Sequence, residues 1–106
     1  MFKAMFFLYR RADWTVEQFH EYSRETHMPL VSRVPGLKRY VVNHTAMNPS
    51  AIENASDAVA ELWFDSPDAF QAALGSPEAA AALGDQPNYL DMSRTHMLFV
   101  EEISGI

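Results

Sequence analysis

Residues 15–44 read TVEQFHEYSRETHMPLVSRVPGLKRYVVNH, and this stretch decides how the rest of the chain is arranged. Thr15 and Gln18 have the spacing of a capping box, which predicts that a helix begins here. Pro29 has no N–H to donate to the carbonyl of Glu25, so the helix is expected to kink or restart near Met28. Pro35-Gly36 ends the helix, and residues 37–45 then have the composition of a strand.

The same helix carries a histidine on its apolar face. The face is formed at helical spacing by Val16, Phe19, Ser23, His27, Leu30 and Val34. His27 is therefore expected to point inward. An inward imidazole beside a weakened helix indicates the wall of a pocket.

The remaining elements follow from local signals. Strands are predicted at residues 2–9, 58–65 and 94–103. Two short helices begin at Ser66-Pro67 and Ser76-Pro77, and glycines at positions 75 and 84 are expected to end them. Residues 84–93 are predicted as a loop. Residues 46–57 form a long connection, which favours either a binding loop or a solvated link.

The order of these elements is strand, helix, strand, strand, helical region, strand. This order predicts an α+β fold of the ferredoxin-like βαββαβ type, a four-stranded antiparallel sheet with helices on one face. A chain of 106 residues with 48% hydrophobic residues fits one domain spanning residues 1–106.

Both faces of the predicted sheet are apolar, although helices can cover only one of them. In the first strand Phe6 and Leu8 lie on one side and Met5 and Phe7 on the other. A whole exposed apolar face is larger than soluble monomers normally show. We therefore expect a homodimer in which two sheets pack face to face as a dimeric α/β barrel.

Composition excludes several classes of function. The formal charge is −6 and the basic residues are scattered, so neither nucleic acid nor a membrane is an expected partner. The chain has no cysteine, which excludes disulfides and thiolate chemistry and is compatible with a cytoplasmic location. No metal-binding, phosphate-binding or dinucleotide-binding motif is present, so no metal or cofactor is expected.

The sequence resembles the EthD-like family of the dimeric α/β barrel superfamily along nearly its whole length. The resemblance lies in residues 8–10, Phe19, and residues 27–30, 34–37, 39–40, 43–44 and 60–65. It implies a ligand held between the helices and the sheet, and a role in the degradation of small organic compounds. The wider superfamily includes cofactor-independent monooxygenases, lactone isomerases and polyketide cyclases, and a few haem-binding branches.

The function predicted from these features is cofactor-independent proton-transfer chemistry on a small hydrophobic cyclic or aromatic compound. The isomerase, cyclase and monooxygenase types stay open. One alternative is a non-catalytic barrel that sequesters such a compound, as in a stress response. Another is a haem-binding protein with His27 as axial ligand.

Two histidines are the catalytic candidates. An imidazole titrates near neutral pH, so His27 could take and return a proton; the alternative is a core histidine satisfied by backbone carbonyls. His44 could orient a substrate oxygen or share a proton with His27, or it could simply be a strand-end residue bonded to the loop.

Four further residues are the substrate-binding candidates. Tyr40 shares the side of its strand with His44. Glu61 could orient an imidazole and Trp63 could stack on a flat ring, unless Glu61 pairs with an arginine and Trp63 belongs to the core. Tyr9 could bind a substrate carbonyl or reach solvent.

Overall fold

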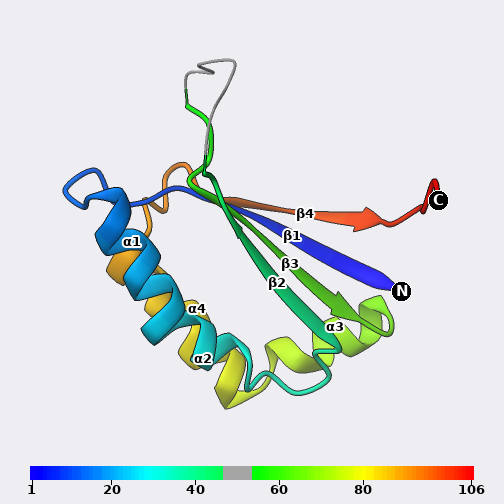
Figure 1. Ribbon diagram of the computed structural model, residues 1–106. Helices are drawn as coiled ribbons and strands as arrows, with labels where there is room; N and C mark the ends of the chain where they lie inside the picture. Colours follow the sequence, from blue (N-terminus) through cyan, green and yellow to red (C-terminus); the bar gives the residue numbers. More distant parts are fainter. Residues whose placement is uncertain (47–53) are drawn as a thin grey trace.

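The computed structural model describes residues 1–46 and 54–106, and its strands form one sheet. The strands are β1 (Phe2–Leu8), β2 (Arg39–His44), β3 (Ala58–Phe64) and β4 (His96–Glu101), arranged in the antiparallel order β2-β3-β1-β4. The helices all lie on one face of this sheet (Figure 1). The predicted ferredoxin-like α+β architecture is confirmed, with strands slightly shorter than predicted. Residues 47–53 of the long loop lie outside the described residues.

The first helical region is interrupted where the proline predicts it. Helix α1 (Val16–Tyr22) begins at Thr15, whose capping box with Gln18 is complete. A π-helical turn, η1 (Ser23–His27), follows, and α2 (Met28–Val31) continues from it. The N–H of Met28 donates to the carbonyl of Ser23, five residues back. This wide turn sits just before Pro29, which has no N–H for the next helical bond.

The π turn also changes which residues face the core. Phe19 before the turn, Ser23 at its start and His27 at its end are buried as predicted. A π turn holds one extra residue, which rotates everything after it about the helix axis. Val31 is therefore buried after the turn, whereas Leu30 is only half-buried. Val16, at the start of the predicted stripe, is exposed.

The second helical region runs further than predicted. Helix α3 (Pro67–Leu74) ends before Gly75 as expected, but α4 (Pro77–Tyr89) continues through Gly84 and Pro87. The prediction of a loop at residues 84–93 is therefore wrong for its first half. A glycine costs only about 1 kcal/mol in a helix, and the buried side chains of Asp85 and Tyr89 tie this part of α4 to the core. No helix of residues 1–46 and 54–106 is long and apolar enough to cross a membrane.

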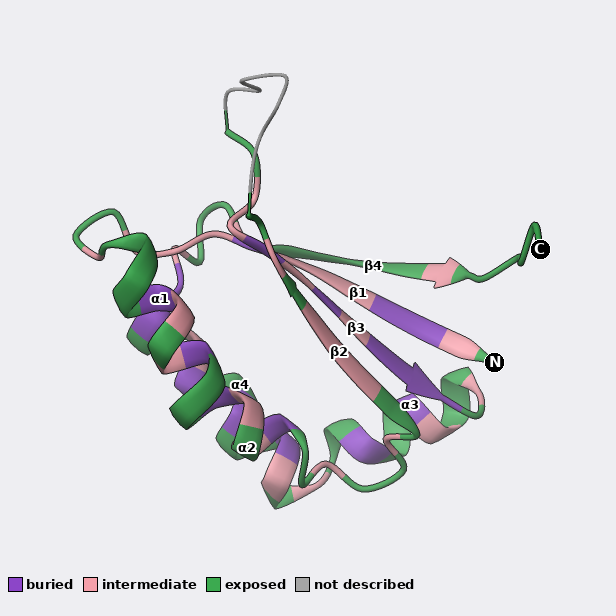
Figure 2. Cartoon of the chain, viewed as in Figure 1, coloured by how far each residue is buried: buried purple, intermediate pink, exposed green. Residues whose placement is uncertain are grey.

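The two faces of the sheet differ in what covers them. Buried residues gather on β1 and β3, the two central strands (Figure 2). On the helix side, Ala4, Leu8 and Phe64 pack against helix residues including Phe19 and Phe70. On the other side, Leu98 is 51% exposed next to Met5. The described residues of the single chain thus leave the apolar centre of this face without a cover.

Candidate functional site

A cavity of about 260 Å³ lies between the helices and the sheet. Its walls come from β1, β2, β3, β4 and from α2, α3 and α4, and they are made mostly of aliphatic and aromatic side chains. Phe6, Phe64 and Phe70 supply flat apolar surface. His27, Tyr40 and Gln86 are the polar side chains among the described residues that line it. A few polar groups in an apolar cavity are typical of a small-molecule site.

His27 is held at this cavity by a carboxylate on a different helix. Its Nδ1 lies 2.9 Å from Oδ2 of Asp85, and both side chains are less than a tenth exposed. Asp85 in turn accepts hydrogen bonds at Oδ1 from the hydroxyl of Tyr22, at 2.5 Å, and from the side-chain amide of Asn88, at 3.0 Å. These contacts use both carboxylate oxygens and fix the orientation of the imidazole.

The electrostatics of the pair favour a neutral imidazole on an ionised carboxylate. Burial lowers the pKa of His27, and this outweighs the opposite effects of the hydrogen bond and charge of Asp85. Burial raises the pKa of Asp85, but the hydrogen bonds from Tyr22, Asn88 and His27 lower it further than burial raises it. Because the carboxylate can only accept, the proton of neutral His27 is on Nδ1 and Nε2 carries the free lone pair.

The tyrosine on the cavity wall complements this histidine. Burial raises the pKa of Tyr40, so its hydroxyl stays protonated at neutral pH. Within residues 1–46 and 54–106, no protein group hydrogen-bonds to this hydroxyl or to Nε2 of His27. The cavity therefore offers a ligand a proton acceptor at His27 and a proton donor at Tyr40, in addition to the amide of Gln86.

His44 lies on the helix side of the sheet but is used elsewhere. Its Nε2 is hydrogen-bonded to Oγ of Ser23 at 3.1 Å, and its ring stacks on His20 with centroids 4.2 Å apart. Burial, together with the charges of His20 and Arg24, lowers the pKa of His44. His44 is not among the described residues that line the cavity, so the structure does not bring it together with His27 at this site.

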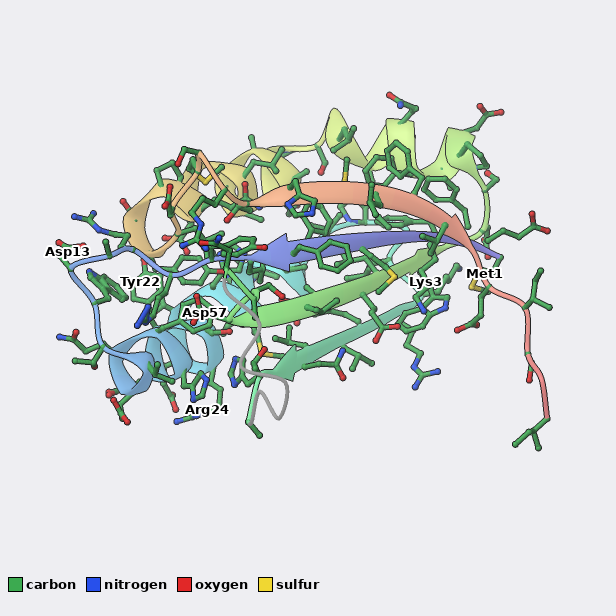
Figure 3. All side chains as sticks on the ribbon, turned by 90° about the horizontal axis from the view of Figure 1, so that it is seen from above. Met1, Lys3, Asp13, Tyr22, Arg24 and Asp57 are labelled. Carbon is green, nitrogen blue, oxygen red and sulfur yellow. The ribbon has the colours of Figure 1, made fainter. Side chains whose placement is uncertain are left out.

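Three of the substrate-binding candidates are on the opposite face of the sheet. Glu61 and Trp63 pair with Met5 and Lys3 of β1, whose side chains alternate away from the helices. Glu61 forms a salt bridge with Lys3, and the Trp63 ring lies between Lys3 and Arg39. Lys3 is labelled near the start of β1 in Figure 3.

Tyr9 is placed at the other end of this face. Its ring is covered by the guanidinium of Arg94 and stacks near His96. The structure therefore separates Tyr9, like Glu61 and Trp63, from the cavity. The strand register puts the sheet between these three residues and the cavity, so the structure does not bring them together with His27.

Sequence reasoning missed Asp85 and Gln86, the two polar residues that α4 brings to the site. Both fall in the segment predicted as a loop. A signal was present, since Ala79, Ala82, Asp85 and Tyr89 continue one helical face through Gly84. In the described part of the chain, no three His, Cys, Asp or Glu side chains gather closely enough to hold a metal ion.

Comparisons with known proteins agree with this architecture. An EthD family protein from Bacillus halodurans has a TM-score of 0.81 at 23% identity, covering 97% of this chain and 100% of that one. A dimeric ferredoxin-like protein of unknown function from Bacteroides fragilis has a TM-score of 0.69 at 18% identity, covering 95% of each chain.

A Nitrosomonas europaea protein provisionally described as an antibiotic biosynthesis monooxygenase has a TM-score of 0.65 at 13% identity, covering 98% of this chain and 100% of that one. No curated protein matches the chain significantly. The model of the EthD domain matches residues 11–93, which contain His27, Tyr40 and Asp85. The chain therefore belongs to the EthD domain family.

Proposed function

We propose that this protein is a cofactor-independent enzyme that moves a proton on a small hydrophobic cyclic or aromatic compound. The observation that carries the proposal is the His27–Asp85 pair at an apolar cavity, with Nδ1 bound to the carboxylate and Nε2 left for a ligand. A neutral imidazole held in one orientation is suited to general base catalysis near neutral pH.

The proposed step uses two groups of the cavity. Nε2 of His27 removes a proton from a carbon next to a carbonyl, or from a phenol. Negative charge then develops on the substrate oxygen, and the hydroxyl of Tyr40 can donate a hydrogen bond to it. The imidazolium formed is stabilised by Asp85 and returns the proton to the same or another carbon, which gives exchange or isomerisation.

Oxygen chemistry would begin with the same proton removal. An anthrone anion formed this way reacts with O₂ to give the anthraquinone and water, with O₂ as the oxidant. The haem alternative has less support, because about 260 Å³ is below the roughly 300–1,000 Å³ of pockets for drug-sized ligands. Sequestration of the ligand without catalysis would use the same cavity. A measurement of turnover distinguishes the two functions.

The test of this function is exchange of hydrogen for deuterium on a neutral ketone. In D₂O, wild-type protein should accelerate loss of the α-proton signals of 1-tetralone in NMR spectra, and the acceleration should persist with a chelator present. Anthrone consumption with O₂ uptake is the second probe. Binding of these compounds with no acceleration of either reaction would contradict the enzyme and favour sequestration.

We further propose that the protein is a homodimer joined through the uncovered face of its sheet. Leu98 is half-exposed there beside Met5, while Lys3 on the same face pairs with Glu61 and Glu102. The Bacteroides fragilis protein of similar fold is described as dimeric. A twofold-related copy would cover the apolar centre of the face without leaving Lys3 unpaired.

The dimer predicts a mass of twice 12.0 kDa for the wild-type chain in analytical ultracentrifugation. Leu98→Glu should shift the protein to the monomer mass, because the new carboxylates would be buried without partners, at a cost of several kcal/mol. Val16→Glu is the matched control, since Val16 is also an exposed aliphatic residue but lies on α1. A monomeric wild type, or an unaffected Leu98→Glu dimer, would contradict this interface.

A further inference from the structure

The chemistry of the cavity wall limits the charge of its ligand. No lysine or arginine occurs among the described residues that line the cavity. The exposed residues at its margin, Leu74, Leu83 and Met97, are apolar as well. The undescribed residues 47–53, MNPSAIE, contain no lysine, arginine or histidine. An anion in the cavity would therefore meet no lysine or arginine among the described residues of its lining.

The histidine of the cavity does not replace such a cation. Burial lowers the pKa of His27, so that its imidazole is neutral at pH 7. The ionised carboxylate of Asp85 lies directly behind it and would repel a bound anion. Arg10 and Lys38 do not line the cavity. They form salt bridges outside it, Arg10 with Asp57 and Lys38 with Asp65.

From these observations we infer that the cavity selects uncharged ligands, such as neutral phenols, ketones and lactones, and rejects carboxylates and phosphates. The inference concerns the same site as the proposed function and deepens it. It rests on the proposed function for the placement of the ligand's polar group at His27 and Tyr40. One polar group of the ligand would lie at His27 and Tyr40, and apart from the amide of Gln86 the rest of the described lining would contact the ligand through apolar side chains. A charged group buried without a partner would cost far more than the neutral hydrogen bonds return.

The size of the cavity adds a second limit. A volume of about 260 Å³ is slightly below the usual range for ligand pockets, roughly 300–1,000 Å³. We therefore expect ligands of two fused rings to fit better than those of four. An acidic natural precursor would have to be decarboxylated, esterified or lactonised before it could bind.

The test uses three compounds with the same ring system. At pH 7.5, 2-naphthol and methyl 2-naphthoate are neutral, whereas 2-naphthoate is an anion. Isothermal titration calorimetry should give a Kd for 2-naphthoate about 30-fold weaker than for either neutral compound, which corresponds to about 2 kcal/mol. The ester controls for shape, because it carries the same carbonyl carbon without the charge.

A variant at the cavity margin tests the same point by gain of binding. Leu83→Arg adds one cation at an exposed position and should tighten binding of 2-naphthoate by about 10-fold or more, whereas the neutral control Leu83→Gln should not. Chemical-shift changes at His27 in NMR spectra would locate each ligand.

The outcomes separate this inference from the proposed function. Selective binding of the neutral compounds without any turnover would leave the charge selection standing and contradict the enzyme. Equal affinity of wild type for 2-naphthoate and its methyl ester would overturn the charge selection, whatever the turnover. Failure of both neutral compounds to bind would overturn it as well.

Discussion

Replacing His27 by glutamine should lower turnover of 1-tetralone or anthrone by about 10²–10⁴-fold, the usual contribution of a general base. Glutamine has similar length and can still donate a hydrogen bond to Asp85, so the buried carboxylate keeps a partner. Its amide has no basic lone pair at neutral pH and cannot accept the substrate proton. The measurement is the steady-state rate under saturating substrate.

Two controls accompany this variant. His20→Gln makes the same change at a half-buried histidine of α1 that does not line the cavity and should leave turnover unchanged. Circular dichroism and thermal melting should show that His27→Gln is folded. If the folded His27→Gln protein turned over substrate at the wild-type rate, His27 would be a core residue and the proposed chemistry would be wrong.

The pH dependence of the wild type follows from the same histidine. Only the neutral imidazole can accept a proton, and burial lowers its pKa from the ordinary value of 6.5. Turnover should therefore be highest where the imidazole is neutral, and its acid limb should be centred below pH 6.5. An acid limb centred above 6.5 would indicate that another group controls the rate.

The sequence predicted the inward position of His27 because the evidence for it is local. Thr15 and Gln18 fix the start of the helix, and the spacing of Phe19, Ser23 and His27 fixes the face. The interruption before Pro29 follows from the missing N–H. These features depend only on residues within about two helical turns of His27. They can therefore be predicted from one sequence without knowledge of the tertiary structure.

The partner of His27 could not be predicted in the same way. Asp85 is 58 residues away, and its contact depends on how α4 packs against η1. Local reasoning also ended α4 at Gly84, where tertiary packing continues it. The alternation of β3 put Glu61 and Trp63 on one face, but only the pairing with β1 shows that this face is turned away from the helices.

The substitution Asp85→Asn should reduce turnover by about 10²–10⁴-fold without removing any catalytic atom, because it should reverse the tautomer of His27. The Oδ1 position accepts hydrogen bonds from Tyr22 and Asn88, so the carbonyl of the new asparagine is best placed there. Its NH₂ group then faces Nδ1 of His27 and donates to it. The imidazole proton is moved to Nε2, which can no longer accept a proton from the substrate.

This prediction can be checked without any substrate. Long-range ¹H–¹⁵N NMR correlations report which ring nitrogen is protonated, and they should show Nδ1–H in the wild type and Nε2–H in Asp85→Asn. The acid limb of the residual activity should also move to lower pH, because the hydrogen bond and charge of Asp85 both raise the pKa of His27 and are lost.

Tyr22→Phe is the matched control for Asp85→Asn, since it removes one donor to Oδ1 but leaves the contact with His27. It should keep the Nδ1–H tautomer and most of the activity. A wild-type rate for Asp85→Asn with the tautomer reversed would show that Nε2 is not the base. An unchanged tautomer combined with lost activity would assign Asp85 a role in charge stabilisation, because the imidazolium formed in the reaction would then lack its counterion.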